Sequence, residues 1–167
     1  PIALDDPVRA TTVGQGHASD HPDYAPGDWV MGLNAIEEYS AVVPDGFTAK
    51  VDVSAVDSPS RFLSAFGAVG LTAYFGLLEV AKPQPGETVL VSGAAGAVGS
   101  VVGQIAKIHG CRTVGIAGGP DKCARLVERY GYDAAVDYRG KSTEQLADAI
   151  REVTPDGANI GFENVGG

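Results

Sequence analysis

The sequence has little positive charge and no long apolar run, and both absences exclude classes of partner. Its 167 residues include 12 Lys and Arg against 21 Asp and Glu, for a formal net charge of −9. No basic stripe is present, so nucleic acid is not expected as a partner, and the acidic surface mainly promotes solubility. No apolar run approaches the roughly 20 residues that span a membrane, and no signal peptide is visible. We therefore expect neither a nucleic-acid nor a membrane partner.

Cysteine is scarce as well. The two cysteines, Cys111 and Cys123, match no metal-ligand spacing, so no metal site is expected. Each is predicted to be a free thiol, which suits a reducing cytoplasm. His17 and His21 are interpreted as polar loop residues. His109 lies in the last turn of a predicted helix and is interpreted as a surface residue.

A glycine-rich run is the most informative feature that is present. Gly93, Gly96 and Gly99 follow the strand-like segment 88–92 and open the helix-like segment 97–109. This context is typical of dinucleotide-binding folds, because glycine lets the backbone approach a pyrophosphate and the helix N-terminus offers free N–H donors. The spacing is a variant of the familiar G-x-G-x-x-G pattern, so a tight turn without a ligand is the alternative.

The next strand-like segment, 113–117, bears on the choice of cofactor. NAD sites carry an acidic residue near this point, whereas here the strand ends in Gly118 and Gly119. Lys122 follows in the first turn of a predicted helix, where a cation is favourable only beside an anion such as the 2′-phosphate of NADP. A solvated surface lysine is the alternative. If Asp121 points into the site instead, NAD would be preferred.

From residue 88 onward the pattern alternates between strands and helices. Alternation of this kind predicts an α/β fold with a parallel sheet, a Rossmann-type doubly wound sheet that is truncated because two strands of the usual six are missing. Ser142 and Gln145 form a predicted capping box at the start of the last helix. The expected strands are 88–92, 113–117, 134–138 and 159–165, and the expected helices are 97–109, 120–130 and 143–153.

The first part of the chain is predicted to be β-rich and irregular. A cap and a proline, Ser58 and Pro59, then predict a helix start, and Gly67 and Gly70 predict a break before a second helix over 71–80. We therefore expect a partial β domain over 1–56 and a nucleotide-binding domain over 57–167. The candidate strands of the first domain are 29–31, 36–43 and 51–53.

Several long segments carry a family resemblance that covers roughly residues 11–167. They are similar to the medium-chain dehydrogenase/reductase superfamily, and within it to the zinc-independent branch of prostaglandin reductases, 2-alkenal reductases and curcumin reductases. The branch-typical segments are 70–77, 82–89, 94–107, 118–123 and 162–167. The stretch 21–28 resembles the end of that superfamily's GroES-like domain, so the resemblance implies a partial GroES-like domain before the Rossmann domain.

The resemblance implies an enzyme that uses NADP(H) to reduce a carbon–carbon double bond conjugated to a ketone or aldehyde. Hydride would go to the β-carbon and a proton to the α-carbon, while hydrogen-bond donors stabilise charge on the carbonyl oxygen. The partner would be a small-molecule enone or enal, and relatives often form homodimers. A quinone oxidoreductase of the same superfamily and a non-catalytic NADPH-binding module are the alternatives.

The resemblance also implies roles for particular residues, whereas no residue can be named as the proton donor. Tyr138 has a second interpretation as an aromatic at the core edge, and Asn164 as a loop residue. Thr72 and Tyr74 are implied to approach the nicotinamide, and core packing explains them equally well. The implied cofactor-binding residues are Gly96, Ala97, Val98 and Gly99 at the pyrophosphate, Lys122 and Tyr138 at the 2′-phosphate, and Asn164 along the cofactor.

Zinc-dependent relatives and short-chain dehydrogenases fit the sequence less well. Catalytic zinc needs Cys, His and Glu ligands together, but His17 is followed by Ala18, and no cysteine lies in the first 110 residues. The four-cysteine structural lobe is absent, and no Tyr-x-x-x-Lys pair follows the glycine run. Because the chain begins with Pro1 and ends abruptly, we expect a piece of a longer protein.

Overall fold

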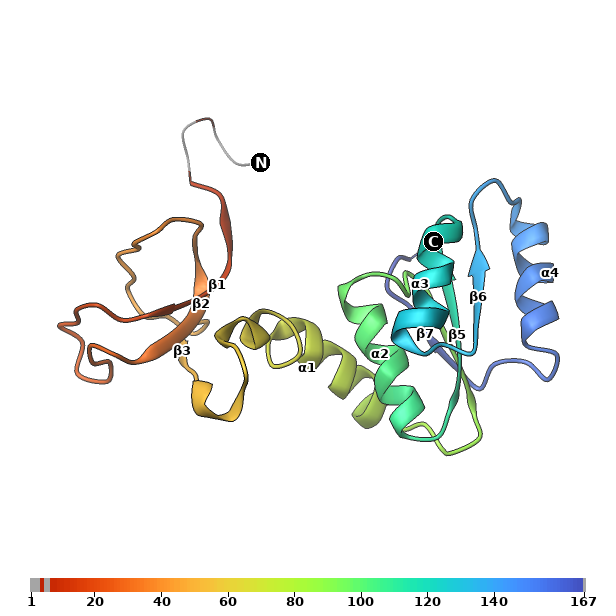
Figure 1. Ribbon diagram of the computed structural model, residues 1–167, viewed down its shortest axis with the longest axis horizontal. Helices are drawn as coiled ribbons and strands as arrows, with labels where there is room; N and C mark the ends of the chain where they lie inside the picture. Colours follow the sequence, from red (N-terminus) through yellow and green to blue (C-terminus); the bar gives the residue numbers. More distant parts are fainter. Residues whose placement is uncertain (1–3, 5–6, 167) are drawn as a thin grey trace. The chain divides into compact units, whose positions relative to one another are not determined.

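The computed structural model describes residue 4 and residues 7–166, which form two compact units (Figure 1). The contacts divide the chain between Ala68 and Val69. This point lies later than the domain boundary proposed between residues 56 and 57, which stays a prediction. Each unit is described by itself below.

The first unit is built on a small antiparallel sheet. Strand β1 (Arg9–Gln15) pairs along its whole length with β2 (Trp29–Ala35), and β2 pairs with the two-residue strand β3 (Ala49–Lys50). Gly27 forms the turn before β2 with a φ of +95°, a conformation that glycine adopts at little cost. The predicted strand over 29–31 is thereby confirmed and extended, whereas β1 was not predicted.

Two predicted strands of this unit are wrong. Residues 36–43 form bends and coil, and the hydroxyl of Ser40 donates to the carboxylate of Glu37 within this segment at 2.5 Å. Residues 51–53 do not form a strand either, because the Asp52 side chain accepts a hydrogen bond from Ser54 N at 2.9 Å and starts a 3-10 turn, Val53–Ala55. Local side-chain to backbone bonds of this kind compete with sheet pairing.

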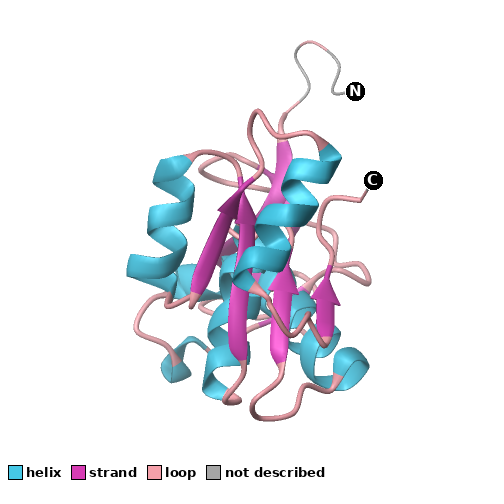
Figure 2. Ribbon diagram, turned by 90° about the vertical axis from the view of Figure 1, so that its right-hand side faces the viewer, coloured by secondary structure: helices cyan, strands magenta, loops and turns pink. Residues whose placement is uncertain are grey.

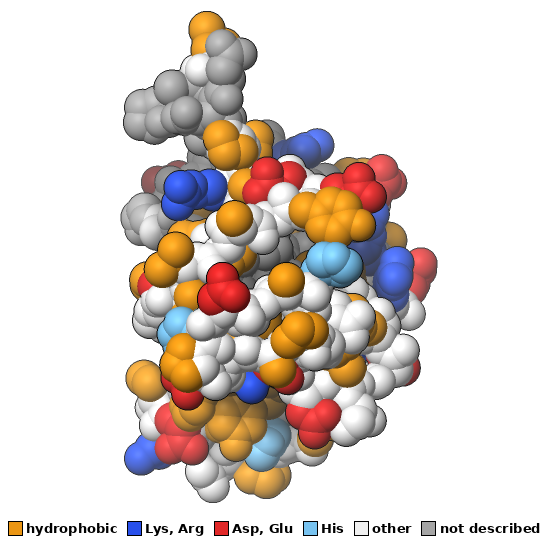
Figure 3. Space-filling model, turned by 90° about the vertical axis from the view of Figure 1, so that its left-hand side faces the viewer, with side chains coloured by type: hydrophobic (Ala, Val, Ile, Leu, Met, Phe, Trp, Pro, Cys, Tyr) orange, Lys and Arg blue, Asp and Glu red, His pale blue; other side chains and the backbone are white. Residues whose placement is uncertain are grey.

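Hydrophobic side chains on one face of the first unit are scattered among polar ones (Figure 3). Large hydrophobic side chains that are exposed in this unit include Ile36, Tyr39, Val43 and Phe47. A three-stranded sheet with so little buried apolar area contributes little to stability by itself.

The helix start at Ser58 is confirmed, although a short 3-10 helix, Pro59–Leu63, forms there. The Ser58 side chain accepts a hydrogen bond from Ser60 N, and Pro59 occupies the first position. The predicted break falls at Gly67, where a Cβ would lie 2.1 Å from the carbonyl oxygen of Phe62.

The predicted break at Gly70 is wrong, because Gly70 is buried inside helix α1 (Ala68–Tyr74). The helix continues as a π-helical segment, Phe75–Ala81, and ends at Lys82 with a φ of +54°. Gly76 in this segment packs against the ring of Phe162, since a Cβ there would lie 2.9 Å from Cε2.

The second unit contains a four-stranded parallel sheet in the order β6-β5-β4-β7 (Figure 2). Its chain order is therefore 3-2-1-4, which matches the first four strands of the doubly wound dinucleotide-binding sheet. The Rossmann-type prediction is confirmed. The strands are β4 (Thr88–Val91), β5 (Arg112–Ala117), β6 (Ala134–Asp137) and β7 (Ile160–Phe162).

Helices α2 (Ala97–Ile108), α3 (Pro120–Tyr130) and α4 (Thr143–Val153) connect the strands, close to their predicted ranges. Helices α2 and α3 contact each other on one face of the sheet. Right-handed crossovers place α4 on the other face, because the step from β6 to β7 runs back across the sheet. The capping box of Ser142 and Gln145 at the start of α4 is confirmed.

The core lies between this sheet and its helices. Central strands covered on both faces are expected to be largely apolar, and β4 is apolar over residues 89–91 and β5 over residues 114–117. Strand β7 is shorter than predicted, because residues 163–166 leave the strand and form a turn. Among the described residues, no helix has the length and hydrophobicity needed to cross a membrane. Fully buried core residues include Leu77, Val89, Val91, Val102, Val114 and Leu126.

Candidate dinucleotide-binding site

The glycine run forms the turn from β4 into α2, and two of its glycines are required by the backbone. Gly93 has a φ of +53°, in the left-handed region. A Cβ on Gly99 would lie 2.7 Å from Ala94 Cα and from the carbonyl oxygen of Gly93. Because these neighbours are backbone atoms, they cannot move aside cheaply. The glycine spacing thus brings the start of α2 into close contact with the backbone of the turn that follows β4.

The N-terminus of α2 is free of side-chain caps. Gly96 is the N-cap residue, with extended backbone, and it offers no side-chain acceptor. The first N–H groups of a helix have no acceptor within the helix, and here they belong to Ala97, Val98 and Gly99. Gly96 and Ala97 are exposed, while Val98 is half-buried. The structure therefore presents uncapped donors and the positive helix end at the surface, which fits the oxygens of a pyrophosphate.

The carboxyl ends of β4 and β7 lie beside this turn, at the point where the strand order of the sheet reverses. Ser92 directly follows β4, and Asn164 lies two residues beyond the end of β7. Asn164 N donates to Ser92 Oγ at 2.8 Å, and Asn164 Nδ2 donates to the carbonyl oxygen of Ser92 at 2.9 Å. Ligands of open α/β sheets bind at such reversal points. The structure therefore places Asn164 beside the glycine turn.

Glu163 completes this arrangement, although it was not among the predicted site residues. Its carboxylate accepts hydrogen bonds from the Ser92 hydroxyl, from Val165 N and from Gly166 N. The Ser92 hydroxyl and these backbone donors hold the pKa of the Glu163 carboxyl below its ordinary value. A signal was present, since both Ser92 and Glu163 stand where neighbouring parallel strands end.

The carboxyl ends of β5 and β6 form a second part of the candidate site. Tyr138 lies against Gly118, where a Cβ would be 2.8 Å from the tyrosine hydroxyl. Asp137 Oδ1 accepts from Gly119 N at 2.7 Å and from Arg139 N at 2.9 Å, and these two donors hold the pKa of the Asp137 carboxyl below its ordinary value. One carboxylate thus ties the two strand ends together.

Basic side chains occur at this second part. Lys122 is exposed in the first turn of α3, as is Asp121. Arg139 was not predicted, and its Nη1 would lie only 3.2 Å from a Cβ on Gly119, the N-cap residue of α3. Within the described part of the chain, neither Lys122 nor Arg139 forms an ion pair. The side chain of Tyr138 is half exposed, so it can contact a ligand.

Tyr132 is bonded to the last glycine of the turn from within the core. Its buried hydroxyl donates to the carbonyl oxygen of Gly99 at 2.7 Å. Gly103 leaves room for the ring, because a Cβ there would lie 2.1 Å from Tyr132 Cε2. Burial raises the pKa of the Tyr132 hydroxyl well above its ordinary value, so the group stays a neutral donor.

The remaining candidate residues lie at the surface or are thiols. Thr72 and Tyr74 are both exposed on α1, so core packing does not explain them. His109 caps the end of α2 and is exposed, as predicted. Cys111 is buried and Cys123 is half-buried, and both are free thiols.

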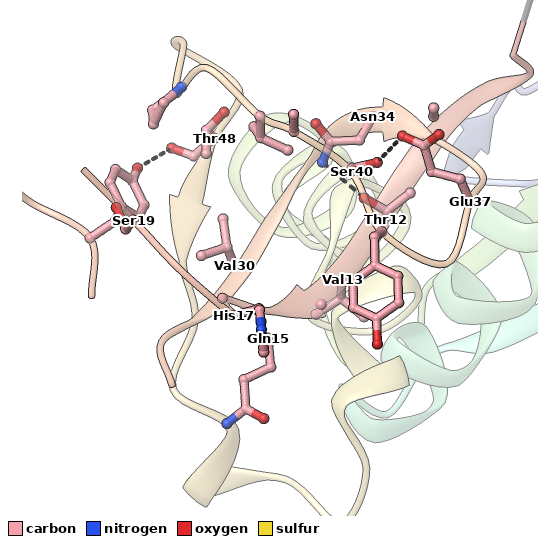
Figure 4. A pocket seen from close by; sticks show the side chains of 18 of the residues that line it. Thr12, Val13, Gln15, His17, Ser19, Val30, Asn34, Glu37, Ser40 and Thr48 are labelled. Carbon is pink, nitrogen blue, oxygen red and sulfur yellow. Dashed lines mark hydrogen bonds between the residues drawn. The ribbon is translucent and has the colours of Figure 1, made fainter. Parts of the chain in front are cut away.

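A large open hollow of about 1120 Å³ lies in the first unit (Figure 4). Thr12 and Asn34 line it and are joined by a hydrogen bond of 2.9 Å between Oγ1 and Nδ2. His17 and His21 also line it. None of its lining residues belongs to the glycine turn or to the strand ends described above, so size alone does not locate the nucleotide site.

Comparison with known proteins places this geometry in a family. The model of the zinc-binding dehydrogenase family matches residues 97–167. The chain is 38% identical over 167 residues to the NADPH-dependent curcumin reductase of Escherichia coli, covering all of this chain and 47% of that protein. It is 52% identical over 108 residues to prostaglandin reductase 1 of Bos taurus, covering 65% of this chain and 32% of that protein.

A solved structure aligns with the whole of this chain. The crystal structure of CurA from Vibrio vulnificus in complex with NADPH aligns with a TM-score of 0.83 at 38% identity, covering 100% of this chain and 48% of CurA. The chain belongs to the medium-chain dehydrogenase/reductase superfamily. This medium-chain dehydrogenase/reductase spans about half the length of the curated relatives it matches.

The matched family is named for zinc, and the described residues of this medium-chain dehydrogenase/reductase do not form a site that fits that metal. Over residue 4 and residues 7–166, no group of three or more His, Cys, Asp or Glu side chains is arranged to hold a metal ion. Zinc sites need three or four such ligands together. The residues of the glycine turn and of the strand ends do fit a dinucleotide, on the observation of the uncapped α2 N-terminus.

Proposed function

We propose that the protein is an NADP(H)-dependent oxidoreductase that reduces the C=C bond of α,β-unsaturated ketones or aldehydes. The observation that carries the proposal is the uncapped N-terminus of α2, beside the point where the strand order reverses. Relatives named as curcumin, 2-alkenal and prostaglandin reductases support the substrate class. The NADPH complex of CurA supports the cofactor.

The proposed site divides into three contacts along the cofactor. The N–H groups at the start of α2 bind the pyrophosphate, and Asn164 lies along the cofactor at the β4–β7 reversal. Lys122 and Tyr138 bind the 2′-phosphate at the ends of β5 and β6. The residues proposed for the pyrophosphate are Gly96, Ala97, Val98 and Gly99. The last three offer free N–H groups, whereas Gly96 N already donates to the carbonyl oxygen of Gly93 at 2.9 Å, so Gly96 contributes a close backbone approach.

NADPH, when bound, supplies the hydride for the β-carbon of the substrate. The described residues of the chain bind and orient the cofactor, and none of them is assigned as the proton donor. The absence of a carboxylate at the end of β5 favours NADPH over NADH, since an acid there would bind the ribose 2′-hydroxyl of NAD. Exposed Asp121 is the competing residue, and it would favour NADH if it turned into the site.

A quinone oxidoreductase of the same superfamily is the second candidate. The Pseudomonas syringae quinone oxidoreductase aligns with a TM-score of 0.74 at 26% identity and covers 100% of this chain. Both candidates share the nucleotide fold, so the cofactor site does not separate them. A substrate panel does.

The first test is fluorescence titration with NADPH and NADH at one fixed salt concentration. We expect NADPH to bind about tenfold or more tightly, which corresponds to about 1.4 kcal/mol. Equal affinities, or a preference for NADH, would contradict the proposed 2′-phosphate site and favour Asp121 as the determinant. Binding of neither cofactor would contradict the dinucleotide site itself.

The second test measures turnover of NADPH with enones, enals and quinones. The loss of NADPH absorbance gives the rate. Faster turnover of enones and enals than of quinones is expected. The reverse order would favour the quinone oxidoreductase. NADPH binding without turnover of any compound in the panel would support a non-catalytic NADPH-binding module instead.

A further inference from the structure

The loop that follows β7, residues 163–166, is held to the end of β4 by a set of hydrogen bonds. Ser92 is at the centre of this set, because its hydroxyl donates to the Glu163 carboxylate while the same oxygen accepts from Asn164 N at 2.8 Å. The Ser92 carbonyl accepts from Asn164 Nδ2 at 2.9 Å. Both the backbone and the side chain of Asn164 are therefore fixed by one residue of the neighbouring strand.

Glu163 closes the loop on itself. A single carboxylate oxygen, Oε1, also accepts from Val165 N at 2.6 Å and from Gly166 N at 3.0 Å. An unpaired carboxylate beside an anion-binding helix end would repel a phosphate. Here the charge of Glu163 is directed onto donors of its own loop and of Ser92, so it organises the loop instead.

The loop also packs directly on the glycine turn. A Cβ placed on Gly93 would lie 3.1 Å from Val165 Cγ2 and 3.5 Å from Asn164 Cβ. A loosened loop would lose this packing and would no longer hold Asn164 at the reversal point.

The position of the loop in the sheet assigns it to one half of the cofactor. In doubly wound sheets, each half binds one mononucleotide and the ligand crosses the crevice between them. Strands β4, β5 and β6 make up the first half, and β7 begins the second. Residues that bind the adenosine half are thus separate from the loop after β7.

We propose that Ser92 and Glu163 are positioning residues that lock the 163–166 loop against the glycine turn and hold Asn164 for the nicotinamide half of the cofactor. This inference rests on the proposed function. It predicts that loss of these hydrogen bonds weakens the binding of the whole dinucleotide. A ligand that fills only the adenosine half should bind as before.

The experiment compares two probes, NADPH and adenosine 2′,5′-bisphosphate, by titration on the protein and on Ser92→Ala and Glu163→Ala. For both variants we expect NADPH affinity to fall about tenfold or more, since hydrogen bonds to a charged group are lost, while affinity for the bisphosphate changes less than about twofold. Ser92→Thr keeps the hydroxyl and should recover most of the NADPH affinity.

Amide hydrogen exchange gives a readout that does not depend on activity. In the protein without ligand, Glu163→Ala should raise the exchange rates of the Val165 and Gly166 amides, which donate to the carboxylate in the native loop. Unchanged rates at both amides would contradict the lock.

Ser142→Ala is the matched control, since it removes the N-cap of α4 and destabilises the fold without touching the loop. Its ratio of NADPH to bisphosphate affinity should equal that of the unmodified protein. Equal losses for both probes in Ser92→Ala, or no loss for either, would overturn the positioning role. Failure of the unmodified protein to bind either probe would instead overturn the proposed function.

Discussion

The two phosphate-binding parts of the proposed site are built in different ways. The pyrophosphate part consists of backbone N–H groups on a closely packed glycine turn, in which Gly99 is buried and its carbonyl oxygen accepts a hydrogen bond from Tyr132. The 2′-phosphate part consists of long exposed side chains, Lys122 and Tyr138, on the surface of α3 and after β6. The fold fixes the atoms of the pyrophosphate part, whereas the 2′-phosphate part depends on surface side chains that the fold does not require.

This difference separates stability from selectivity. Changes to the backbone-built part should damage the fold and the binding of every dinucleotide together, because the same atoms serve both. Changes to the side-chain-built part should alter the choice between NADPH and NADH and leave the fold intact. The predictions below test this separation, from the largest expected effect to the smallest.

Gly99→Ala should have the largest effect. The added Cβ would meet backbone atoms of Ala94 and Gly93 at 2.7 Å, so the start of α2 must move away from the glycine turn. We expect the free energy of unfolding to fall by about 3 kcal/mol and the affinities for NADPH and NADH to fall together. Urea unfolding and cofactor titration measure the two quantities.

Gly161→Ala is the control for this substitution, because no atom lies within 4 Å of the added Cβ. Its unfolding free energy should change by less than about 1 kcal/mol. If both glycine variants lost the same stability, the close packing at Gly99 would not be the cause.

Lys122→Gln should weaken the 2′-phosphate part of the site without affecting the pyrophosphate part. Removing the charge should weaken NADPH binding about tenfold, leave NADH binding nearly unchanged, and leave the urea midpoint where it was. Arg129→Gln is the matched control, since it removes a positive charge from the last turn of the same helix. A similar loss of NADPH affinity in both variants would indicate a general charge effect.

Tyr132→Phe should weaken the support of the turn while keeping its shape. The substitution removes the 2.7 Å hydrogen bond to the Gly99 carbonyl and leaves the ring in place. We expect the unfolding free energy to fall by about 1 kcal/mol. Tyr130→Phe, at a half-buried tyrosine of α3, should cost less, and an equal cost for both would contradict the supporting role of the Tyr132 hydroxyl.

The smallest effect should be on pH dependence. Gly119 N and Arg139 N lower the pKa of Asp137 in the folded state, so its contribution to stability is present above the ordinary carboxyl pKa of about 4 and is lost as pH falls below it. Asp137→Asn should flatten the decline of the urea midpoint between about pH 5 and pH 3. An unchanged slope would show that Asp137 does not contribute.

Most of the second unit could be predicted from the sequence, because its signals are local and agree with one another. Apolar strands, the glycine turn and the Ser142 capping box fall close to their predicted positions. The first unit was less predictable. The segment 36–43 contains strand-favouring residues, yet only a partner strand would make it a strand, and pairing depends on tertiary structure.

The candidate site shows the same division. Lys122 and the glycines could be predicted from strand–turn–helix spacing, and their cofactor roles stay predictions. The hydrogen bond between Ser92 and Glu163 and the approach of the Arg139 side chain to Gly119 were not predicted, because each depends on how separate segments of the chain meet in the fold. Glu163 contacts Ser92 only because the connection through α4 returns the chain across the sheet, so that β7 pairs with β4.

The uncapped start of α2 has a thermodynamic consequence. A ligand that binds only the folded state raises the free energy of unfolding by about 2.7 kcal/mol when its concentration is one hundred times its dissociation constant. A protein that completes its helix end with a bound phosphate is therefore most resistant to heat and proteolysis when its cofactor is abundant. Its melting temperature would then report the supply of cofactor.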